Sequence, residues 1–574
     1  MCQAPRMLLL TILGLLPVFA RCFTLKFESK INHIQPPHII FLLADDLGWN
    51  DVGYHGKAGS LINTPFIDKL ARKGVRLENY YVQPVCSPTR IQLMTGRYQI
   101  RMGLQQAKFC PGEVLCLPLN EKLLPEKLKE LGYATHAVGK WHLGMSRRAC
   151  LPTQRGFDSF FGILLGTSHH FTFERMFRIN GRQYVGNALF ENENATNKYR
   201  GQFCTNAYAK RAVEIIKKHD KNKPLFLYVP FQMVHEPDDV PSKFRHMYKN
   251  ISSLQRRFYA GRVAVLDEAV RNITRALRIR GLYQNSVIIF STDNGGAVES
   301  SASNWPLRGS KGTLWEGGIR GVAFVHSELL PVFVRGRINK ELMHVTDWLP
   351  TLVKGVAGGN LSMPHKLDGF NQWQSIRAFR PSPRKVILHE LNTRRDASPW
   401  GKRDRRIWGK LKKLPFNATI RASIREGNWK LITGKAGYSH PSLPSESHLH
   451  KTYKRRNKHS VAIRLYDVSK DPAEKRNIAH YEKRKVKRLL LKLKKFQKQT
   501  KEPLRGKIDE RCDPARFGGS WSPWLTDAKE QDSKTSHSLT DTKQQASKTS
   551  PSLTDAKEHG SKTSPSLTDA KEQG

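Results

Sequence analysis

The chain is short of acidic residues. Its 574 residues include only 49 Asp and Glu against 96 Lys and Arg, so the formal net charge is +47. Such an excess describes partners rather than fold, and it suits nucleic acid, an anionic membrane surface or a sulfated polysaccharide. Hydrophobic residues reach 39%, which allows a sizeable core, and the length allows two or three domains.

Long hydrophobic runs are also scarce. One run, Met7–Ala20, follows Arg6, and Ala20-Arg21-Cys22 resembles a small-x-small cleavage site. A membrane-spanning helix needs about 20 apolar residues, so the run favours a signal peptide over residues 1–22 rather than a membrane anchor. No other stretch is long enough to span a bilayer, and we expect no integral membrane segment in the mature chain.

Asn-x-Ser/Thr sequons also indicate the secretory pathway, where such asparagines are glycosylated. Together with the predicted signal peptide, they argue against a nuclear or cytosolic nucleic-acid binder despite the charge. We therefore expect no nucleic-acid partner and a lysosomal or extracellular location. The sequons are at Asn194, Asn250, Asn272, Asn360 and Asn417.

Cysteine is sparse as well, and two of the eight cysteines, Cys2 and Cys22, would leave with the signal peptide. In an oxidising compartment the default expectation for the rest is three disulfides. The motif around Cys86, however, indicates another use of that residue. The remaining cysteines are Cys86, Cys110, Cys116, Cys150, Cys204 and Cys512.

Continuous apolar runs at residues 38–44, 225–229 and 286–292 predict strands that are buried on both faces. Helical patterns lie between them, at residues 121–131 and 260–279. This order predicts an α/β fold with a large mixed, mostly parallel sheet sandwiched by helices.

Polar side chains directly follow two of these predicted strands. Asp45 and Asp46 end the first run, and Asp293 and Asn294 end the last one. Ligands of parallel sheets bind beyond the carboxyl ends of the strands, and a set made only of oxygen ligands suits a hard cation. Strand-end capping explains any one of these residues more readily than it explains the group.

A change of composition separates residues 36–375, the predicted main domain, from residues 376–518, a predicted smaller α+β domain. Two strands are expected within residues 418–433 and a third at residues 465–468. Between residues 486 and 496, apolar side chains recur at helical spacing opposite a lysine-rich face. This pattern favours an amphipathic helix that covers the small sheet over a helix that binds membranes or polyanions.

The tail, residues 519–574, contains a repeat with a register of 14 residues that begins at Leu525. Each copy holds a single Leu, which cannot bury a core, and Ser, Thr, Lys and Pro dominate. We expect this tail to be disordered rather than a solenoid.

The segment Val85-Cys86-Ser87-Pro88-Thr89-Arg90 is suited to binding an anion. Ser87 is a favourable N-cap and Pro88 a favourable first helical residue. Cys86 should then lie just before a helix N-terminus, where backbone amides and the helix dipole attract negative charge. Arg90 adds a positive fork one turn later. Taken alone, the stretch favours a disulfide cysteine beside a capped helix.

Cys86-x-Pro88-x-Arg90, followed by a helix and Thr95-Gly96-Arg97, resembles the signature of the sulfatase family. Gly139-Lys140-Trp141-His142-Leu143-Gly144 resembles a second motif of that family. The resemblance extends from about Pro37 to Asp513 and is strongest to the arylsulfatase B group. Segments similar to that group lie at residues 151–158, 304–309, 314–318 and 347–352.

The resemblance implies an alkaline-phosphatase-like fold and hydrolysis of sulfate esters, on sulfated sugars such as N-acetylgalactosamine 4-sulfate of glycosaminoglycans. It implies that formylglycine-generating enzyme, as a partner during synthesis, converts Cys86 to formylglycine. The metal ligands implied for one Ca²⁺ are Asp45, Asp46, Cys86 in its modified form, Asp293 and Asn294. The other catalytic residues implied are Arg90, Lys140, His142, His235 and Lys311.

The mechanism implied by the resemblance is covalent, with the hydrated formylglycine as nucleophile. Arg90 would hold the hydrate, His235 or Lys311 would protonate the departing alcohol, and His142 would take a proton as sulfate is released. This agrees with the chemistry, because a sulfate ester needs cations on its oxygens and an acid at its leaving oxygen. A serine or an unmodified thiol lacks the second hydroxyl that breaks down the intermediate.

Two further features follow from comparison with the family pattern. The resemblance pairs Cys116 with Cys150 and Cys110 with Cys512, which leaves Cys204 without a partner. Residues 168–204 depart from the pattern and should lie near the substrate entrance, so the choice of substrate is left open. The polar side chains of interest there are His169, His170, Arg175, Arg178 and Arg182.

Two alternative functions differ in class. A catalytically weak, glycosaminoglycan-binding protein on a sulfatase scaffold would suit the charge, but the complete set of metal and catalytic residues argues against it. A phosphatase or phosphodiesterase would use Ser or Thr with zinc, and the sequence lacks the His-rich zinc set. Separately, basic runs in the C-terminal half predict binding to heparin-like polyanions, at residues 402–406, 412–413, 455–456 and 483–485.

Overall fold

A computed structural model describes six segments of the chain: residues 35–56, 61–105, 107–393, 414–439, 462–504 and 506–526. The described residues up to Leu525 belong to one compact unit. The predicted signal peptide, the basic runs between residues 402 and 456 and residues 527–574 of the predicted tail lie outside the described residues. Residues 519–526 of that tail, which was expected to be disordered, are described, and Trp521 among them is buried. Within the described segments, no helix combines the length and the apolar character needed to cross a bilayer.

A ten-stranded sheet forms the centre of the fold, in the order β13-β2-β12-β11-β1-β10-β4-β5-β8-β9. The middle block β11-β1-β10-β4-β5 is parallel throughout. The predicted strands β1 (His38–Ala44), β10 (Leu225–Pro230) and β11 (Ser286–Thr292) are neighbours in this block and are buried along their whole length. β12 and β8 pair antiparallel with the two ends of the block, so the predicted mixed sheet is confirmed.

The other strands of this sheet are β2 (Val75–Leu77), β4 (Ala134–Lys140), β5 (Ser159–Ile163), β8 (Leu189–Glu191), β9 (Asn194–Ala195), β12 (Ala323–His326) and β13 (Ile338–Asn339).

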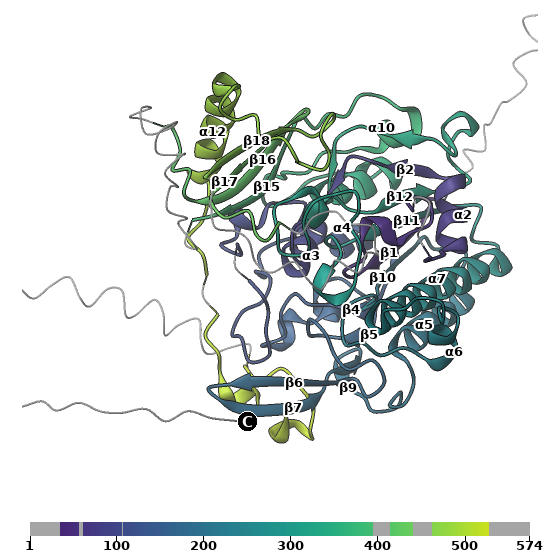
Figure 1. Cartoon of the computed structure of the whole chain (residues 1–574). Coiled ribbons are helices and arrows are strands. Elements are labelled where there is room, and N and C mark those ends of the chain that lie inside the picture. Colours follow the sequence, from purple (N-terminus) through teal and green to yellow (C-terminus); the bar gives the residue numbers. More distant parts are fainter. Residues whose placement is uncertain are drawn as a thin grey trace, which may run out of the picture. The chain divides into compact units, whose positions relative to one another are not determined.

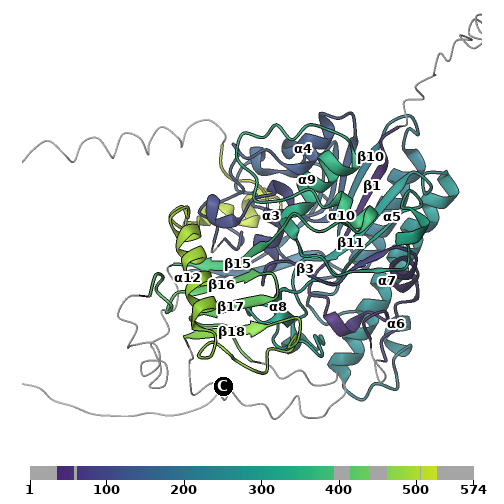
Figure 2. The same cartoon turned by 90° about the horizontal axis from the view of Figure 1, so that it is seen from above.

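Helices cover both faces of the sheet (Figures 1 and 2). On one face lie α5 (Cys204–Lys218) and α7 (Leu254–Arg280), and on the other lie α3 (Cys86–Thr95) and α4 (Leu124–Lys129). The helix expected at residues 260–279 is confirmed and is longer, because the Ser253 side chain caps its start and Gly281 ends it in the left-handed conformation. α4 is shorter than expected, since the Leu123 amide is capped by the Glu126 carboxylate and the chain turns away soon afterwards.

A separate antiparallel sheet follows in chain order: β15 (Val386–Asn392), β16 (Arg421–Glu426), β17 (Trp429–Thr433) and β18 (Ile463–Asp467). Helix α12 (Lys483–Gln497) lies along this sheet (Figure 2). Its buried face packs into one apolar cluster with residues of the strands, which confirms the predicted amphipathic helix. The side chains on that face are Val486, Leu489, Leu490 and Leu493.

The cysteines agree only in part with the expected pairing. Cys116 and Cys150 form a disulfide, whereas Cys110, Cys204 and Cys512 are free in this structure. The expected Cys110–Cys512 bond is therefore not formed in this structure, in which the Cys512 sulfur lies close to Gly112. Cys204 Sγ lies 3.6 Å from a ring nitrogen of His170, and burial raises the pKa of this thiol to about 12.

Candidate active site

The polar residues at the ends of β1 and β11 meet at one edge of the sheet. The two strands are parallel and in register up to Ala44 and Thr292, so the next residues of each strand must be neighbours. The Asp46 amide donates to Asp293 Oδ1 at 3.4 Å, and Asn294 Nδ2 donates to Asp46 Oδ1 at 2.7 Å. The sequence analysis placed these residues together, and the structure brings all four to this edge.

Two oxygens in this cluster are buried without a hydrogen-bond partner among the described residues, Asp45 Oδ1 and Asn294 Oδ1. Leaving such an acceptor unpaired costs about 1–3 kcal/mol. Side-chain ligand atoms of Asp45, Asp46 and His235 also lie within 4.8 Å of one another. Buried, unpaired oxygens beside a cluster of carboxylates fit a hard cation, which takes oxygen ligands.

Helix α3 begins at Cys86 itself, two residues earlier than the cap chemistry predicts. Val85 is the N-cap, in an extended conformation and without a side-chain capping bond. The predicted cap, Ser87, is inside the helix, where its hydroxyl lies 3.2 Å from His142 Nε2 and 3.4 Å from the Lys108 carbonyl. The prediction of Ser87 as the N-cap was wrong because tertiary contacts bind its hydroxyl, but Cys86 does lie at the start of the helix.

Arg90, which lies about one turn after Cys86 in α3, is fully buried. Its guanidinium donates to Asp293 Oδ2 at 2.7 and 3.2 Å and to the Lys140 carbonyl at 3.1 Å, and it lies 3.5 Å from Asp45 Oδ2. Burial lowers the pKa of Arg90, but nearby negative groups, with Asp293 first among them, together outweigh burial and keep the pKa above its usual range. The positive fork predicted from the sequence thus faces the carboxylates in this structure.

Lys140 and His142 follow from strand β4. Lys140 is buried at the end of the strand, and its Nζ lies 2.5 Å from Asp45 Oδ2. Although burial raises the pKa of Asp45, the surrounding cations, with Lys140 first among them, together outweigh this effect and hold the pKa below its usual range. His142 has a positive φ of 56° and lies 2.7 Å from the Lys108 carbonyl through Nε2. Burial and the nearby Lys140 charge lower the pKa of His142 well below its usual value.

His235 and Lys311 approach the cluster at Asp46. Lys311 Nζ lies 2.7 Å from Asp46 Oδ2, and His235 Nε2 lies 3.8 Å from the same oxygen. Burial lowers the pKa of Lys311, but the neighbouring negative groups, with Asp46 first among them, together hold it above its usual range. Burial lowers the pKa of His235.

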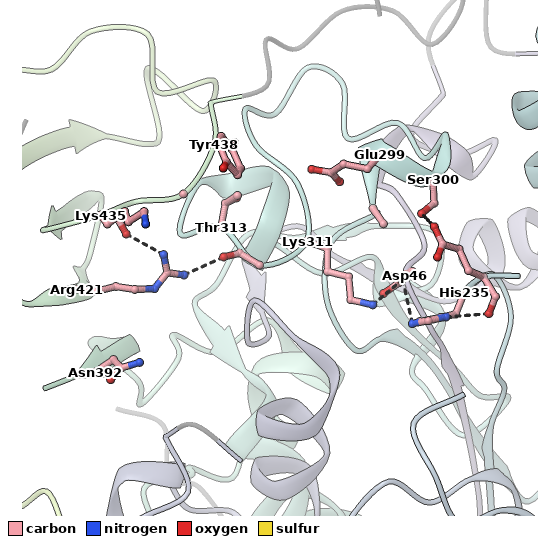
Figure 3. A pocket seen from close by; sticks show the side chains of 14 residues that line it. Asp46, His235, Glu299, Ser300, Lys311, Thr313, Asn392, Arg421, Lys435 and Tyr438 are labelled. Atoms are coloured by element: carbon pink, nitrogen blue, oxygen red, sulfur yellow. Dashed lines mark hydrogen bonds and ion pairs between the residues drawn. The ribbon is translucent and has the colours of Figure 1, made fainter. Parts of the chain in front are cut away.

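A pocket of about 610 Å³ opens beside Asp46, His235 and Lys311. Figure 3 shows these residues on one side and a second group of side chains, from the region of the small sheet, on the other. Carboxylate and hydroxyl groups of Glu236, Glu299 and Ser300 lie on the His235 side. The second group consists of Asn392, Arg421, Lys435 and Tyr438.

Residues 37–356 match the sulfatase family. The chain belongs to the sulfatase family. It is 44% identical to arylsulfatase J of Mus musculus over 517 residues, which cover 88% of this chain and 83% of that relative. It is 31% identical to N-acetylgalactosamine-6-sulfatase of Homo sapiens over 376 residues, covering 62% and 69%. The solved structure of Ps i-CgsB in complex with k-i-k-neocarrahexaose matches with a TM-score of 0.67 at 26% identity, covering 84% of this chain and 98% of the other.

As a sulfatase, the protein is a sulfuric ester hydrolase, and its pocket contains residues that the family motifs do not identify. Arg421, Lys435 and Tyr438 lie outside every motif of the sequence analysis, and only their position after folding connects them to Lys311. The one sequence signal for Arg421 is its place at the start of a predicted strand. Its cross-strand partner in the sheet is Asn392.

The segment expected at the substrate entrance divides into two parts. His170 lies near the active site, since its ring nitrogen is 3.2 Å from the His235 carbonyl, and His169 pairs with Asp239 at 2.9 Å. Arg175, Arg178 and Arg182 instead belong to a hairpin of β6 (Glu174–Ile179) and β7 (Arg182–Asn187), against which the C-terminal segment packs. Trp521 Nε1 donates to the Arg175 carbonyl at 2.8 Å, and none of the three arginines lines the pocket.

Proposed function

We propose that this sulfatase hydrolyses sulfate esters of sulfated sugars such as N-acetylgalactosamine 4-sulfate of glycosaminoglycans, with Cys86 converted to formylglycine and one bound Ca²⁺. The observation that carries the proposal is the pair of buried, unpartnered oxygens on Asp45 and Asn294, beside the helix that begins at Cys86. The name of the relative N-acetylgalactosamine-6-sulfatase supports a sulfated amino sugar as the substrate class.

Asp45, Asp46, Asp293 and Asn294 would hold the cation, and residue 86 in its modified form would complete the set. A bound Ca²⁺ would supply positive charge that makes a coordinated hydroxyl more acidic. Arg90 and Lys140 already neutralise part of the carboxylate charge, through Asp293 and Asp45 respectively. The site therefore keeps part of its negative charge, which a divalent cation would neutralise.

Formylglycine in its hydrated form supplies two hydroxyls on one carbon, one for attack and one for release. Around it, this chain places Lys311 Nζ and His235 Nε2 on the pocket side, where both approach Asp46. We assign protonation of the departing alcohol to one of these two groups. His142, which lies beside the Ser87 hydroxyl, is assigned to take the proton from the second hydroxyl of the hydrate.

The proposed modification requires formylglycine-generating enzyme as a partner during synthesis, and thus the secretory pathway. We place the mature protein in the lysosome or outside the cell. Residues 36–375 are the proposed catalytic domain and residues 376–518 the proposed smaller domain, which adds Arg421 and Lys435 to the pocket.

The direct test is sulfate release from an aryl sulfate and from N-acetylgalactosamine 4-sulfate, by protein made together with formylglycine-generating enzyme. Cys86→Ser should reduce turnover by a factor on the order of 10³ or more, as loss of a nucleophile does, while the protein stays folded. Cys204→Ala, which changes another free cysteine, is the matched control and should keep its activity. Equal activity of Cys86→Ser and the parent protein would falsify the proposal.

A further inference from the structure

Acidic and basic side chains line different sides of the pocket beside Lys311. On the His235 side lie three carboxylates, of which Asp46 pairs with Lys311, Glu236 accepts from Ser300, and Glu299 accepts from the Ser310 hydroxyl at 2.7 Å. On the side of the small sheet lie two cationic side chains, Arg421 and Lys435, as Figure 3 shows.

Arg421 is held in place by backbone carbonyls. Its guanidinium donates to the Lys435 carbonyl at 2.7 Å and to the Gly312 carbonyl at 2.9 Å. Among the described residues, no carboxylate oxygen lies within the 4.0 Å of an ion pair with it. The buried Glu390 is the carboxyl on which its charge acts, since burial raises the pKa of Glu390 and Arg421 lowers it. The carbonyls thus orient the side chain, and the guanidinium, which is hydrogen-bonded to no carboxylate of the described segments, remains able to bind an anion.

The same contacts fix Arg421 relative to the reaction centre. Gly312, which accepts from Arg421, follows Lys311 directly, and its amide donates to the Pro84 carbonyl at 2.6 Å, two residues before Cys86. One short loop therefore links the small sheet, Lys311 and the start of α3. The two cationic positions, Lys311 and Arg421, stand at a defined separation across the pocket.

We propose that the natural substrate carries a second anionic group, and that Arg421 and Lys435 bind this group while its scissile sulfate ester lies beside Lys311. The substrate class is a sulfated saccharide whose second anion is either another sulfate or a uronate carboxylate. This proposal rests on the proposed function, since it concerns the substrate of the same pocket. It assigns the selection of the substrate to the small sheet and the reaction to the strand ends of the large sheet.

The test compares kcat/KM for four substrates: an aryl sulfate, N-acetylgalactosamine 4-sulfate, N-acetylgalactosamine 4,6-disulfate and a uronate-containing disaccharide with one 4-sulfate. The parent protein should favour at least one substrate with two anions. Arg421→Gln should lower that preference, measured against N-acetylgalactosamine 4-sulfate, by about tenfold, the size expected for a lost charged hydrogen bond. The substrate whose preference falls identifies the second anion as sulfate or carboxylate.

Three companion variants separate binding from folding. Lys435→Gln keeps the backbone contacts of Arg421 and should lower the same preference by a smaller factor. Arg421→Lys should restore part of it, and Arg377→Gln, an exposed arginine on α10 (Trp373–Ala378), should leave it unchanged. Equal losses on all four substrates in both Arg421→Gln and Lys435→Gln, or no preference in the parent protein, would overturn this proposal. Failure of the parent protein on every substrate would instead count against the proposed function.

Discussion

The two sides of the active site are built in opposite ways. At the strand ends, Asp45, Arg90, Lys140 and Asp293 have fully buried side chains, and each is bound to another member of the group. Across the pocket, the Lys435 and Tyr438 side chains are exposed, and Arg421 donates to two backbone carbonyls. A closed ionic network can hold reacting groups in one geometry, whereas an open cationic wall can be changed without disturbing that network. We therefore expect substitutions to separate the proposed substrate choice from the chemistry.

The largest effects are expected when one fully buried carboxylate, Asp293, and one carboxylate at the pocket, Asp46, are each replaced by Ala. Asp293→Ala and Asp46→Ala should both abolish turnover, because each removes a proposed Ca²⁺ ligand. Only Asp293→Ala should destabilise the fold strongly, by about 3–5 kcal/mol, since it leaves the buried Arg90 short of its main partner. Asp46→Ala leaves Lys311, whose side chain is 22% exposed, able to reach water, and should cost about 1 kcal/mol or less.

Unfolding should be followed in urea with a chelator present, so that lost cation binding does not contribute to the difference. Equal free energies of unfolding for the two variants would contradict the distinction between a closed network and an open wall. Full activity in either variant would refute its assignment as a Ca²⁺ ligand.

A second prediction concerns a buried ion-pair cluster that connects the small sheet to the segment around Glu316. Buried Lys430, on the small sheet, lies 2.9 Å from a carboxylate oxygen of both Glu316 and Glu474. Burial, opposed by Lys430, raises the pKa of Glu474 from its usual 4.5 to about 7. Since the folded protein holds this proton more tightly than the unfolded chain, Glu474 makes the free energy of unfolding fall as pH rises from about 4.5 to 7.

Glu474→Gln should remove this contribution. Its melting temperature should gain on that of the parent protein as pH is raised from about 5 to about 8, by a few degrees at most. Glu214→Gln, which changes a partly exposed glutamate on α5, should follow the parent curve. Parallel curves for Glu474→Gln and the parent protein would show that this carboxyl does not titrate in that range.

The smallest effect is expected on the outer surface of the small sheet. On α12, Arg488 and Lys492 pair with Glu426, and Lys485 pairs with Glu482, so part of the basic face is already neutralised. We therefore expect the predicted polyanion binding to depend on the exposed Lys483, Arg484 and Lys487. Changing these three to Gln should reduce the salt concentration needed for elution from heparin, because fewer counterions are displaced on binding.

Lys217, Lys218 and Lys221 provide a control triple substitution on and beside α5, and it should have less effect on retention. Turnover of an aryl sulfate should be unaffected by either triple change. Unchanged retention of the α12 variant would exclude this helix as the polyanion contact, and lost turnover would show that the helix is needed for the structure of the active site.

The sequence was sufficient for the strand ends because their signals are local. Continuous apolar runs predict the buried strands, and the polar residues after them must meet once the strands are parallel and in register. The environment of Arg90 could not be predicted in this way, since its partner Asp293 lies 203 residues away and only folding brings the carboxylate under α3. The start of α3 was misplaced because the Ser87 hydroxyl is bound by tertiary contacts.

The pocket wall could not be predicted for a similar reason. Nothing in the neighbourhood of Arg421 distinguishes it from the many other arginines of this basic chain, and its role follows from the loop contact with Gly312, 109 residues earlier. The arginines of the β6–β7 hairpin were expected near the substrate entrance, and none of the three lines the pocket beside Lys311.

The central claim, that Cys86 is the precursor of the nucleophile, is tested most directly by the mass of the tryptic peptide spanning residues 77–90. Protein from a secretory host that contains formylglycine-generating enzyme should yield this peptide with an aldehyde in place of the thiol. The peptide should resist alkylation at residue 86 and react with a hydrazide probe. A peptide from the same cells that is fully alkylated at Cys86, in a preparation that still hydrolyses sulfate esters, would contradict the account.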